Sequence, residues 1–465
     1  MTNPDRVATN AFFPFLQYSQ NYMPFRHSPQ TTGKDRINRK ERRIMYACRR
    51  DAYIFSYYRN MLSELYEKEL VRLGIQGCPI AYRRIPRHNG EVGGKSNIQF
   101  AKDAFLKIRE LGNCCAIAVD ISSYFDSIDH QRLKHLWCRL LGVERLPPDH
   151  MSVFKNITKY SYVDKMEVYE RLGFYGQKST TASGKIIKGY LIPEKNIKRQ
   201  ICSPTEFRIK ILGQDGKTES LLKKNKENHG IPQGAPISDL LANLYLIDFD
   251  VEMNKLAVEL GGSYLRYSDD ILLVLPVPSN EAKNIMDSLQ DRIKKYGDQL
   301  IIKPSKSFLV RYTKQDDRQV AENIDLKRKT NGLEYLGFRY DGKDVHLRAT
   351  TLSNLYRKIS HSARRHAVAT VKRYPNKKQD ELFALFNFEE FVKKFGKVEN
   401  FENAASKKNW TFWTYVKRSC KEFEPMGSKI GKQASRIRKN SKHKVRGEIT
   451  SALKCKEKVN VESDP

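Results

Sequence analysis

Two adjacent carboxylates, Asp269 and Asp270, lie in the motif Tyr-Ser-Asp-Asp between two apolar segments. Residues 263–266 and 271–275 are rich in aromatic, β-branched and leucine side chains, which predicts a β-hairpin with the acidic pair at its turn. Two like charges on a tight turn between buried strands are costly unless a cation neutralises them, and a divalent metal ion commonly does so. Alone, such a pair would be an ordinary solvated turn.

A third carboxylate, Asp120, follows the apolar run 114–119, which is short enough to be a buried strand. If this strand lies beside the hairpin, Asp120 joins Asp269 and Asp270 in one cluster. Hard oxygen ligands of this kind hold pairs of Mg²⁺ ions about 4 Å apart in enzymes that transfer phosphoryl groups. Taken alone, Asp120 would equally suit a helix N-cap.

A loop rich in glycine and proline precedes the hairpin. Residues 230–236 read Gly-Ile-Pro-Gln-Gly-Ala-Pro, a composition that lets the backbone approach a ligand closely. Ser238 or Asp239 then caps a helix predicted from Leu240 onwards. Without the acidic motifs on either side, this loop would be a turn before a helix and nothing more.

In this order, the three elements resemble the palm of reverse transcriptases. The catalytic blocks of that family resemble residues 120–125, 233–243 and 267–270. Two weaker blocks resemble a lysine-bearing segment at 301–306 and a primer-grip hairpin at 333–338. The order of five blocks is far more specific than any one of them.

The resemblance covers roughly residues 80–340 and implies an α/β right-hand polymerase with palm sheet, fingers and helical thumb. It also implies two Mg²⁺ ions, for which Mn²⁺ could substitute, held by the three carboxylates and the carbonyl of Ile121. The chain departs from the family pattern at Ser238-Asp239, where Ser-Pro is usual, and at Ser268, where alanine is commoner. Neither departure removes a metal ligand.

Further roles follow from the same resemblance. Phe125 would exclude a ribose 2′-hydroxyl, and Gln233 would touch the template or the nucleotide. Lys306 would protonate the pyrophosphate leaving group, although it could equally be an exposed lysine without a role. Leu336 and Gly337 would belong to the primer grip.

The fingers are predicted around a glycine-rich loop at residues 86–97. Basic residues on a loop of this kind can close over the triphosphate of an incoming nucleotide, and Arg83, Arg84 and Lys95 are the candidates. A solvated loop is the alternative for each. Residues 90–96 superficially resemble a phosphate-binding P-loop, but the Gly-x-x-x-x-Gly-Lys spacing is missing, so that interpretation is rejected.

The composition suits a nucleic-acid enzyme. Lys and Arg number 84 against 53 acidic residues, which gives a formal charge of +31 and predicts a polyanionic partner. The eight cysteines show no metal-ligand spacing and are expected to be free thiols in a reducing compartment. No apolar run could span a bilayer and no signal-peptide core is visible, so a cytoplasmic location is expected.

Four regions are predicted along the chain: an N-terminal arm and helices (1–75), fingers and palm (76–340), a helical thumb-like region (341–428) and a basic C-terminal tail (429–465). Within them we expect an extended arm over 1–38, helical spacing from Arg39 to Leu70, a strand at 80–85, a helix at 98–111, a surface excursion around 179–185 and amphipathic helices at 382–395 and 410–416. The tail is a candidate RNA- or DNA-binding extension, because it is basic and poor in apolar residues.

The predicted function is RNA-directed DNA synthesis from deoxynucleotides, with an RNA template and a DNA product. Residues 51–84, with 94–98 after them, look like the stand-alone bacterial reverse transcriptases associated with phage defence, which commonly work with a non-coding RNA. The alternatives are a non-catalytic RNA-binding scaffold with a palm fold, a retron or group II intron type of reverse transcriptase, and an RNA-dependent RNA polymerase. The sequence is compatible with an oligomer.

Overall fold

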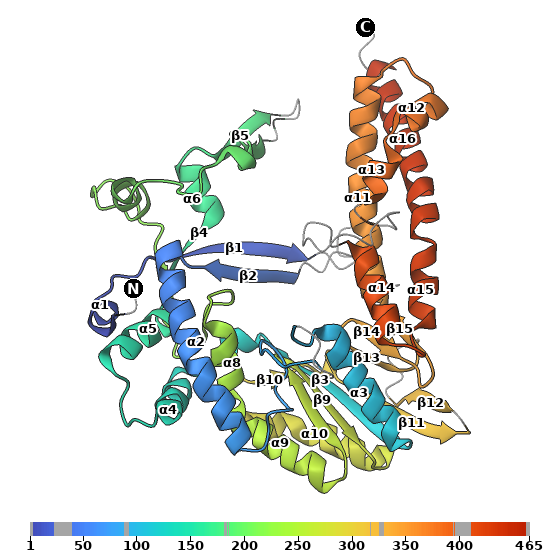
Figure 1. The fold of residues 1–465 in the computed structure, drawn as a ribbon. Coiled ribbons are helices and arrows are strands. Elements are labelled where there is room, and N and C mark those ends of the chain that lie inside the picture. The colour runs from blue at the N-terminus through green and yellow to red at the C-terminus, as the bar shows by residue number, and fades with distance from the viewer. Residues whose placement is uncertain are drawn as a thin grey trace.

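The computed structural model describes residues 3–22, 40–87, 93–180, 184, 186–316, 318–324, 330–393, 395 and 411–461. Figure 1 shows a palm sheet at the base, N-terminal helices and strands on one side, and a tall pair of helices on the other. This is the α/β right-hand architecture that the sequence predicts. Within the described residues, no helix is long and apolar enough to cross a membrane.

The palm sheet is built around β3 (Cys114–Ser122). Its described strands run in the order β12-β11-β3-β9-β8, and β10 pairs with the end of β3. The other strands are β8 (Ser263–Tyr267), β9 (Asp270–Leu275), β10 (Ile301–Ile302), β11 (Phe308–Gln315) and β12 (Arg318–Asn323). The predicted strand at 114–119 and the predicted hairpin at 263–275 are confirmed, and β9 is hydrogen-bonded to both β3 and β8.

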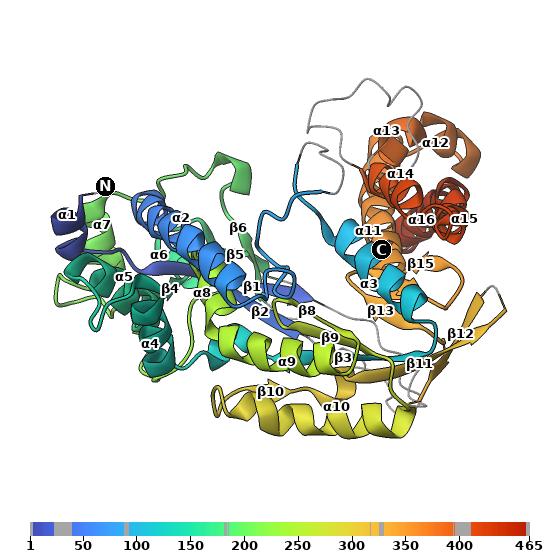
Figure 2. The same ribbon diagram turned by 60° about the horizontal axis from the view of Figure 1, so that its bottom comes forward.

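Alternate residues of β3 face two separate hydrophobic cores, because successive side chains of a strand point to opposite faces. Cys115, Ile117 and Val119 join the first core, whereas Cys114 and Ala116 join the second. Figure 2 shows α10 and α3 on opposite sides of the sheet. The first core is covered by α2 (Arg49–Arg72), α4 (His130–Leu141), α5 (Pro148–Thr158), α8 (Ser238–Tyr245), α9 (Ile247–Glu259) and α10 (Ser279–Lys294).

The second core lies under α3 (Asn97–Leu111) and the C-terminal helices. α3 begins with a capping box between Ser96 and Gln99, which satisfies backbone donors at its first turn. Its buried residues, including Ile98, Ala101, Phe105 and Ile108, recur at helical spacing. The helix predicted at 98–111 is confirmed.

The N-terminal region differs from its prediction. In place of an extended arm, it forms α1 (Pro4–Ala8) and the strands β1 (Phe15–Tyr22) and β2 (Lys40–Tyr46). These strands join a sheet of order β2-β1-β4-β7, with β4 (Ser161–Asp164) and β7 (Lys223–Lys224). The helix predicted from Arg39 begins only at Arg49, because pairing with β1 holds the preceding segment as a strand. Residues 23–39 of the predicted arm lie outside the described residues.

The region between β4 and β7 is a surface excursion, as predicted. It contains α6 (Lys165–Arg171), the hairpin β5 (Tyr175–Thr180) and β6 (Ile186–Tyr190), and the short α7 (Pro204–Glu206). A small separate core around Val168, Tyr169 and Ile211 holds it together. Residues 181–183 and 185, in the middle of the prediction, lie outside the described residues.

After the palm, a small sheet leads into the helical region. The sheet consists of β13 (Leu333–Tyr335), β14 (Phe338–Tyr340) and β15 (Val345–Leu347). The helices are α11 (Ala349–Arg373), α12 (Gln379–Leu385), α13 (Phe388–Lys393), α14 (Phe412–Glu422), α15 (Ser428–Ser435) and α16 (Ile437–Val461). The single helix predicted at 382–395 is two helices, because the backbone becomes extended at Phe386.

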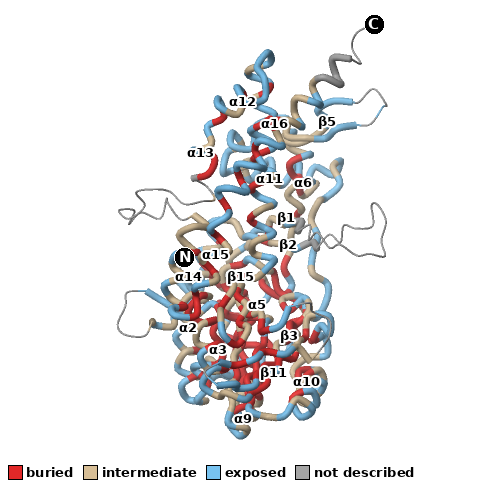
Figure 3. The backbone as a smooth tube through the Cα atoms, turned by 90° about the vertical axis from the view of Figure 1, so that its right-hand side faces the viewer, coloured by how far each residue is buried: buried red, intermediate tan, exposed pale blue. Residues whose placement is uncertain are grey.

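The predicted basic tail from Lys429 onwards is not a tail in its described part. It forms α15 and α16, and α16 packs along α11. Ile437, Val445 and Ile449 are buried in the second core, so the few apolar residues of this segment lie on one helical face. Figure 3 shows buried segments, in red, among the otherwise exposed turns of the C-terminal helices.

The strand predicted at 80–85 is also absent from the described structure. The chain makes an isolated bridge between Pro79 and Arg266 and then turns at Tyr82, whose φ is +61°. The Arg83 guanidinium donates to the carbonyls of Gln76 and Pro79 at 2.7 and 2.6 Å, which stabilises the turn. The strand prediction was wrong because it rested on β propensity, which does not include side-chain contacts of this kind.

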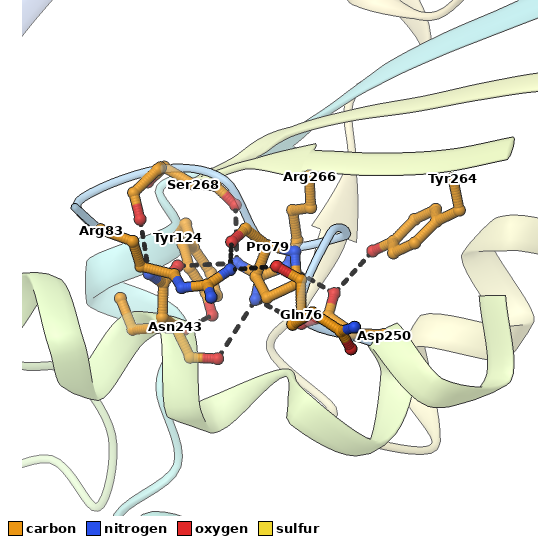
Figure 4. Close-up of polar contacts among 11 residues, drawn as sticks. Gln76, Pro79, Arg83, Tyr124, Asn243, Asp250, Tyr264, Arg266 and Ser268 are labelled. Carbon is orange, nitrogen blue, oxygen red and sulfur yellow. Dashed lines mark hydrogen bonds and ion pairs between the residues drawn. The ribbon is translucent and has the colours of Figure 1, made fainter. Parts of the chain in front are cut away.

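A buried ion pair joins the palm elements beneath this turn. Arg266 on β8 and Asp250 on α9 are both 0% exposed, with Nη2 and Oδ2 2.6 Å apart. Arg266 also donates to the carbonyls of Asn243 at 3.1 Å and Ser268 at 3.2 Å. Tyr264 donates to Asp250 at 2.7 Å, so both oxygens of that carboxylate accept hydrogen bonds (Figure 4).

This network generates a prediction about stability. Arg266→Met or Asp250→Asn should each lower the free energy of unfolding by about 3–5 kcal/mol, because each leaves an uncompensated buried group. Urea unfolding followed by circular dichroism measures the loss. Arg292→Met is the control, since its pair with Glu252 is partly exposed and should be worth at most about 1 kcal/mol. Equal losses for the buried and the exposed pair would contradict the prediction.

Candidate active site

The sheet brings the three predicted carboxylates together. Asp120 of β3 and Asp270 of β9 are register partners, and Tyr267 of β8 pairs with Asp270 on the other side. Asp269 lies in the two-residue turn of the hairpin, after Ser268 with a φ of +60°. The Ile121 amide donates to the Asp269 carbonyl at 2.9 Å, which ties the turn to the end of β3.

The carboxylates repel one another at the rim of the sheet, where Asp120 is buried, Asp269 is half-buried and Asp270 reaches the surface. Burial, followed by the charges of Asp269 and Asp120, raises the pKa of Asp270 to about 7. Burial and then Asp120 also raise the pKa of Asp269. Binding a proton or a cation stabilises a cluster of this kind, because it reduces the repulsion between the carboxylates. This is the electrostatic character of a cation-binding site.

Lys306 reaches this cluster. It ends a short 3-10 turn after β10, and its ammonium forms an ion pair with the Asp120 carboxylate. The Lys303 amide donates to the Asp120 carbonyl at 3.0 Å, which fixes the segment carrying Lys306 against β3. The structure therefore places Lys306 within the site rather than on an unrelated surface.

The sequence predicts that these residues bind metal ions. Among the residues that the structure describes, no group of three or more His, Cys, Asp or Glu side chains is arranged as a formed metal site. The donors themselves suit Mg²⁺, because three carboxylates supply hard oxygen ligands. The Lys306 ammonium pairs with Oδ1 of Asp120, so it competes with a metal ion for this carboxylate.

The predicted nucleotide contacts Phe125 and Gln233 lie on the segments that follow β3 and precede α8. Phe125 is partly buried against the first core, and its carbonyl accepts from the Ile231 amide at 2.9 Å. The Gln233 carbonyl accepts from the Met45 amide of β2 at 2.8 Å. Gly234 has a φ of +112°, and a Cβ there would lie 2.7 Å from the Met45 carbonyl oxygen. This close approach requires glycine.

The predicted basic contacts are placed differently. The Arg83 side chain is 6% exposed and pairs with Glu67 at 2.6 Å, and the Lys95 ammonium pairs with Asp103 at 2.7 Å. Both charges are engaged in ion pairs within the fold, and their role as phosphate contacts stays a prediction. Arg84 is exposed. Residues 88–92 of the glycine-rich loop lie outside the described residues.

The primer-grip prediction falls on the turn between β13 and β14. Leu336 and Gly337 have φ values of +45° and +95°, and the Leu336 carbonyl accepts from the Asn97 side chain at 3.1 Å. The Gly337 carbonyl accepts from the Arg348 amide at 2.9 Å. The turn is thus held between α3 and the start of α11.

Two arginines near the site were missed by the sequence reasoning. Arg42 and Arg43 of β2 are exposed, and their charges oppose the burial that raises the pKa values of Asp269 and Asp126 respectively. The available signal was the basic run from Arg39 to Arg43, which the predicted helix obscured. Pairing with β1 holds both residues in a strand in place of the predicted helix.

Comparison with known proteins agrees with this geometry. Residues 191–340 match the family model described as reverse transcriptase (RNA-dependent DNA polymerase). The match includes the loop at Gln233, the acidic pair, Lys306 and the β13–β14 turn; the sheet register adds Asp120, which lies before it. No curated protein matches the chain in sequence.

Several solved telomerase structures share a partial likeness. Apo telomerase from Candida tropicalis is 13% identical with a TM-score of 0.37, over 90% of this chain and 61% of that chain. Telomerase from Candida albicans in complex with a TWJ fragment of telomeric RNA is 12% identical with a TM-score of 0.34, over 89% of this chain and 57% of that chain. The chain thus spans less than two thirds of these relatives. On the family match and the geometry of its palm, the chain carries a reverse transcriptase domain, the domain type of RNA-directed DNA polymerases.

Proposed function

We propose that this chain extends a primer with deoxynucleotides on an RNA template. The observation that carries the proposal is the register of Asp120 with Asp270, which brings the third carboxylate to the acidic turn of a matched reverse transcriptase domain. A non-catalytic scaffold would not require three carboxylates in one cluster.

In this proposal Asp120, Asp269 and Asp270, with the carbonyl of Ile121, hold two Mg²⁺ ions. When bound, the ions would activate the primer hydroxyl and stabilise the charge that develops on the phosphates. Lys306 has a double role that follows from its contact with Asp120. It compensates the carboxylate before the metal binds, and once released it can donate a proton to the pyrophosphate leaving group.

The remaining residues act on the substrates. Phe125 lies after β3 on the segment hydrogen-bonded to Ile231, where a partly buried ring could reject the 2′-hydroxyl of a ribonucleotide. Gln233, fixed through its backbone to β2, would contact the template or the nucleotide. Arg42, exposed on β2, adds positive charge near Asp269, and Arg43 adds it near Asp126.

The C-terminal helices support an RNA partner beyond the template. α11 contains Lys and Arg residues but no Asp or Glu. Lys429, Lys432 and Arg436 line an open surface pocket of about 510 Å³ at the base of α15 and α16. Sequence-independent phosphate contacts require clustered cations of this kind. A non-coding RNA bound here, with a role in phage defence within the cytoplasm, is the biological setting that we propose.

Loss of the acidic pair tests the catalytic proposal. Replacing Asp269 and Asp270 by Ala should lower the rate of DNA synthesis by at least about 10³-fold. RNA binding should persist, because the proposed phosphate contacts lie elsewhere. Incorporation of labelled deoxynucleotide and filter binding measure the two effects. The matched control replaces Asp287 and Asp291, two exposed acids of α10, and should keep full activity. Residual synthesis by the first variant would overturn the catalytic assignment.

A pH dependence follows from the raised pKa of Asp270. An unfolded Asp titrates near about 3.9, so the folded chain binds the extra proton between that pH and about 7 and loses stability as the pH rises through this window. With a chelator present to remove metal ions, Asp270→Asn should therefore unfold at a higher temperature than the wild type at pH 8, but not at pH 4. Adding Mg²⁺ should stabilise the wild type more than the variant. A gain that is independent of pH would contradict this assignment.

Salt dependence tests the RNA surface. Replacing Lys432, Arg436 and Lys439 by Gln should weaken RNA binding and reduce the slope of log affinity against log salt by roughly 2 to 3, because each lost phosphate contact contributes about 0.7 to 0.9. Lys255, Lys283 and Lys294, on α9 and α10, provide a charge-matched control. Identical slopes for the two triple variants would place the RNA elsewhere.

A further inference from the structure

Tyr82 has an unusual backbone conformation next to the catalytic turn. Its φ of +61° lies in the left-handed region, which is unfavourable for an aromatic residue and persists only when the surroundings enforce it. The enforcing contacts are on both sides. The Ala81 carbonyl accepts from the Asn243 side chain at 2.8 Å, and the Ile80 amide donates to the Arg266 carbonyl at 2.9 Å.

The consequence of this backbone is the position of the Tyr82 side chain. Its hydroxyl donates to Oγ of Ser268 at 3.3 Å, at the residue that precedes Asp269 in the turn. Ser268 is 3% exposed, whereas Tyr82 is 43% exposed. The ring of Tyr82 also lies 6.5 Å from that of Tyr267, centroid to centroid. Tyr82 thus stands beside the turn, with one end bonded to it and much of its surface open.

Arg59 connects the backbone of Tyr82 to the start of α8. Nη2 of Arg59, on α2, donates to the Tyr82 carbonyl at 3.1 Å. The same guanidinium donates to both carboxylate oxygens of Asp239, at 2.9 Å from Nη2 and 3.1 Å from Nε. Asp239 also accepts from the Leu240 amide at 2.7 Å, in the first turn of the helix that follows the Gln233 loop.

These contacts form one chain: Asp239, Arg59, Tyr82 and Ser268. Its two ends are the first turn of α8, at Asp239, and the acidic turn, at Ser268. The Ser268 carbonyl meanwhile accepts from buried Arg266, so the turn is held from below by Arg266 and from the side by Tyr82.

We propose that Tyr82 is a positioning residue for DNA synthesis, which couples the Gln233 loop and helix α2 to the acidic turn. Its hydroxyl restrains Ser268, and thereby the orientation of Asp269 and Asp270 at the moment of reaction. Arg59 connects Asp239 to the Tyr82 backbone, because its guanidinium donates hydrogen bonds to both. The inference rests on the proposed function, because its effect is exerted on the polymerisation step.

The test compares Tyr82→Phe, Ser268→Ala and the double variant in single-turnover incorporation of one deoxynucleotide. Each single variant removes one partner of the same hydrogen bond, so each should lower the maximal rate by about 3- to 10-fold. The apparent affinity for the nucleotide should change by less than about two-fold. The double variant should be no slower than either single variant, because the shared contact is already lost.

Tyr53→Phe is the matched control, since Tyr53 lies on α2 with 62% exposure and should keep the full rate. Arg59→Met tests the other half of the path and should lower the rate without weakening nucleotide affinity. Thermal unfolding of the same preparations separates positioning from folding: the proposal expects Tyr82→Phe to lose rate with an unchanged midpoint.

Three results would overturn the proposal: a full rate for Tyr82→Phe, multiplying losses in the double variant, or a rate loss that follows the unfolding midpoint. A folded wild-type chain that binds primer and template but incorporates no nucleotide would instead refute the proposed function itself. The wild-type rate, measured first, therefore distinguishes the two failures.

Discussion

The buried ion pair between Arg266 and Asp250 is the interaction on which the active-site geometry depends. A charged pair with no solvent exposure is stable only when its remaining hydrogen-bonding capacity is satisfied. Here that requirement draws in Tyr264, the Asn243 backbone and the carbonyl of Ser268. The contacts join α8, α9 and β8, and they end on the turn that carries Asp269. The orientation of the acidic turn is therefore set from within the core.

The site next to this pair carries an excess of negative charge. Three carboxylates approach one another at the end of β3 and β9, and their repulsion and burial raise the pKa values of Asp269 and Asp270. The Lys306 ammonium compensates Asp120 but belongs to a segment of its own, held by the Lys303 amide. A cluster with this imbalance can exchange a proton or an ammonium for a stronger cation, which is the property that metal-assisted phosphoryl transfer requires.

The N-terminal half contributes to the site through backbone contacts as much as through charge. The Met45 amide of β2 meets the Gln233 carbonyl, and Gly234 permits that approach. Arg59 of α2 joins the Tyr82 carbonyl to Asp239 in the first turn of α8. Hydrogen bonds thus connect segments far apart in the chain to the Gln233 loop, to the start of α8 and to the acidic turn.

The sequence by itself determined the central palm strand β3, the acidic hairpin, α3 and the identity of the three carboxylates. These features have strong local signals: apolar runs of strand length, helical spacing of apolar residues, and two acidic motifs in a fixed order. Tertiary structure decided the rest. Residues 40–46 became a strand because β1 pairs with them, and the basic segment after Lys429 became helices because α11 covers its sparse apolar face. The sequence predicts Arg83 and Lys95 as phosphate contacts because they are basic residues beside a glycine-rich loop, whereas the structure pairs them with Glu67 and Asp103. Such partners lie far apart in sequence or on another element, and local periodicity and composition contain no information about which residues will meet.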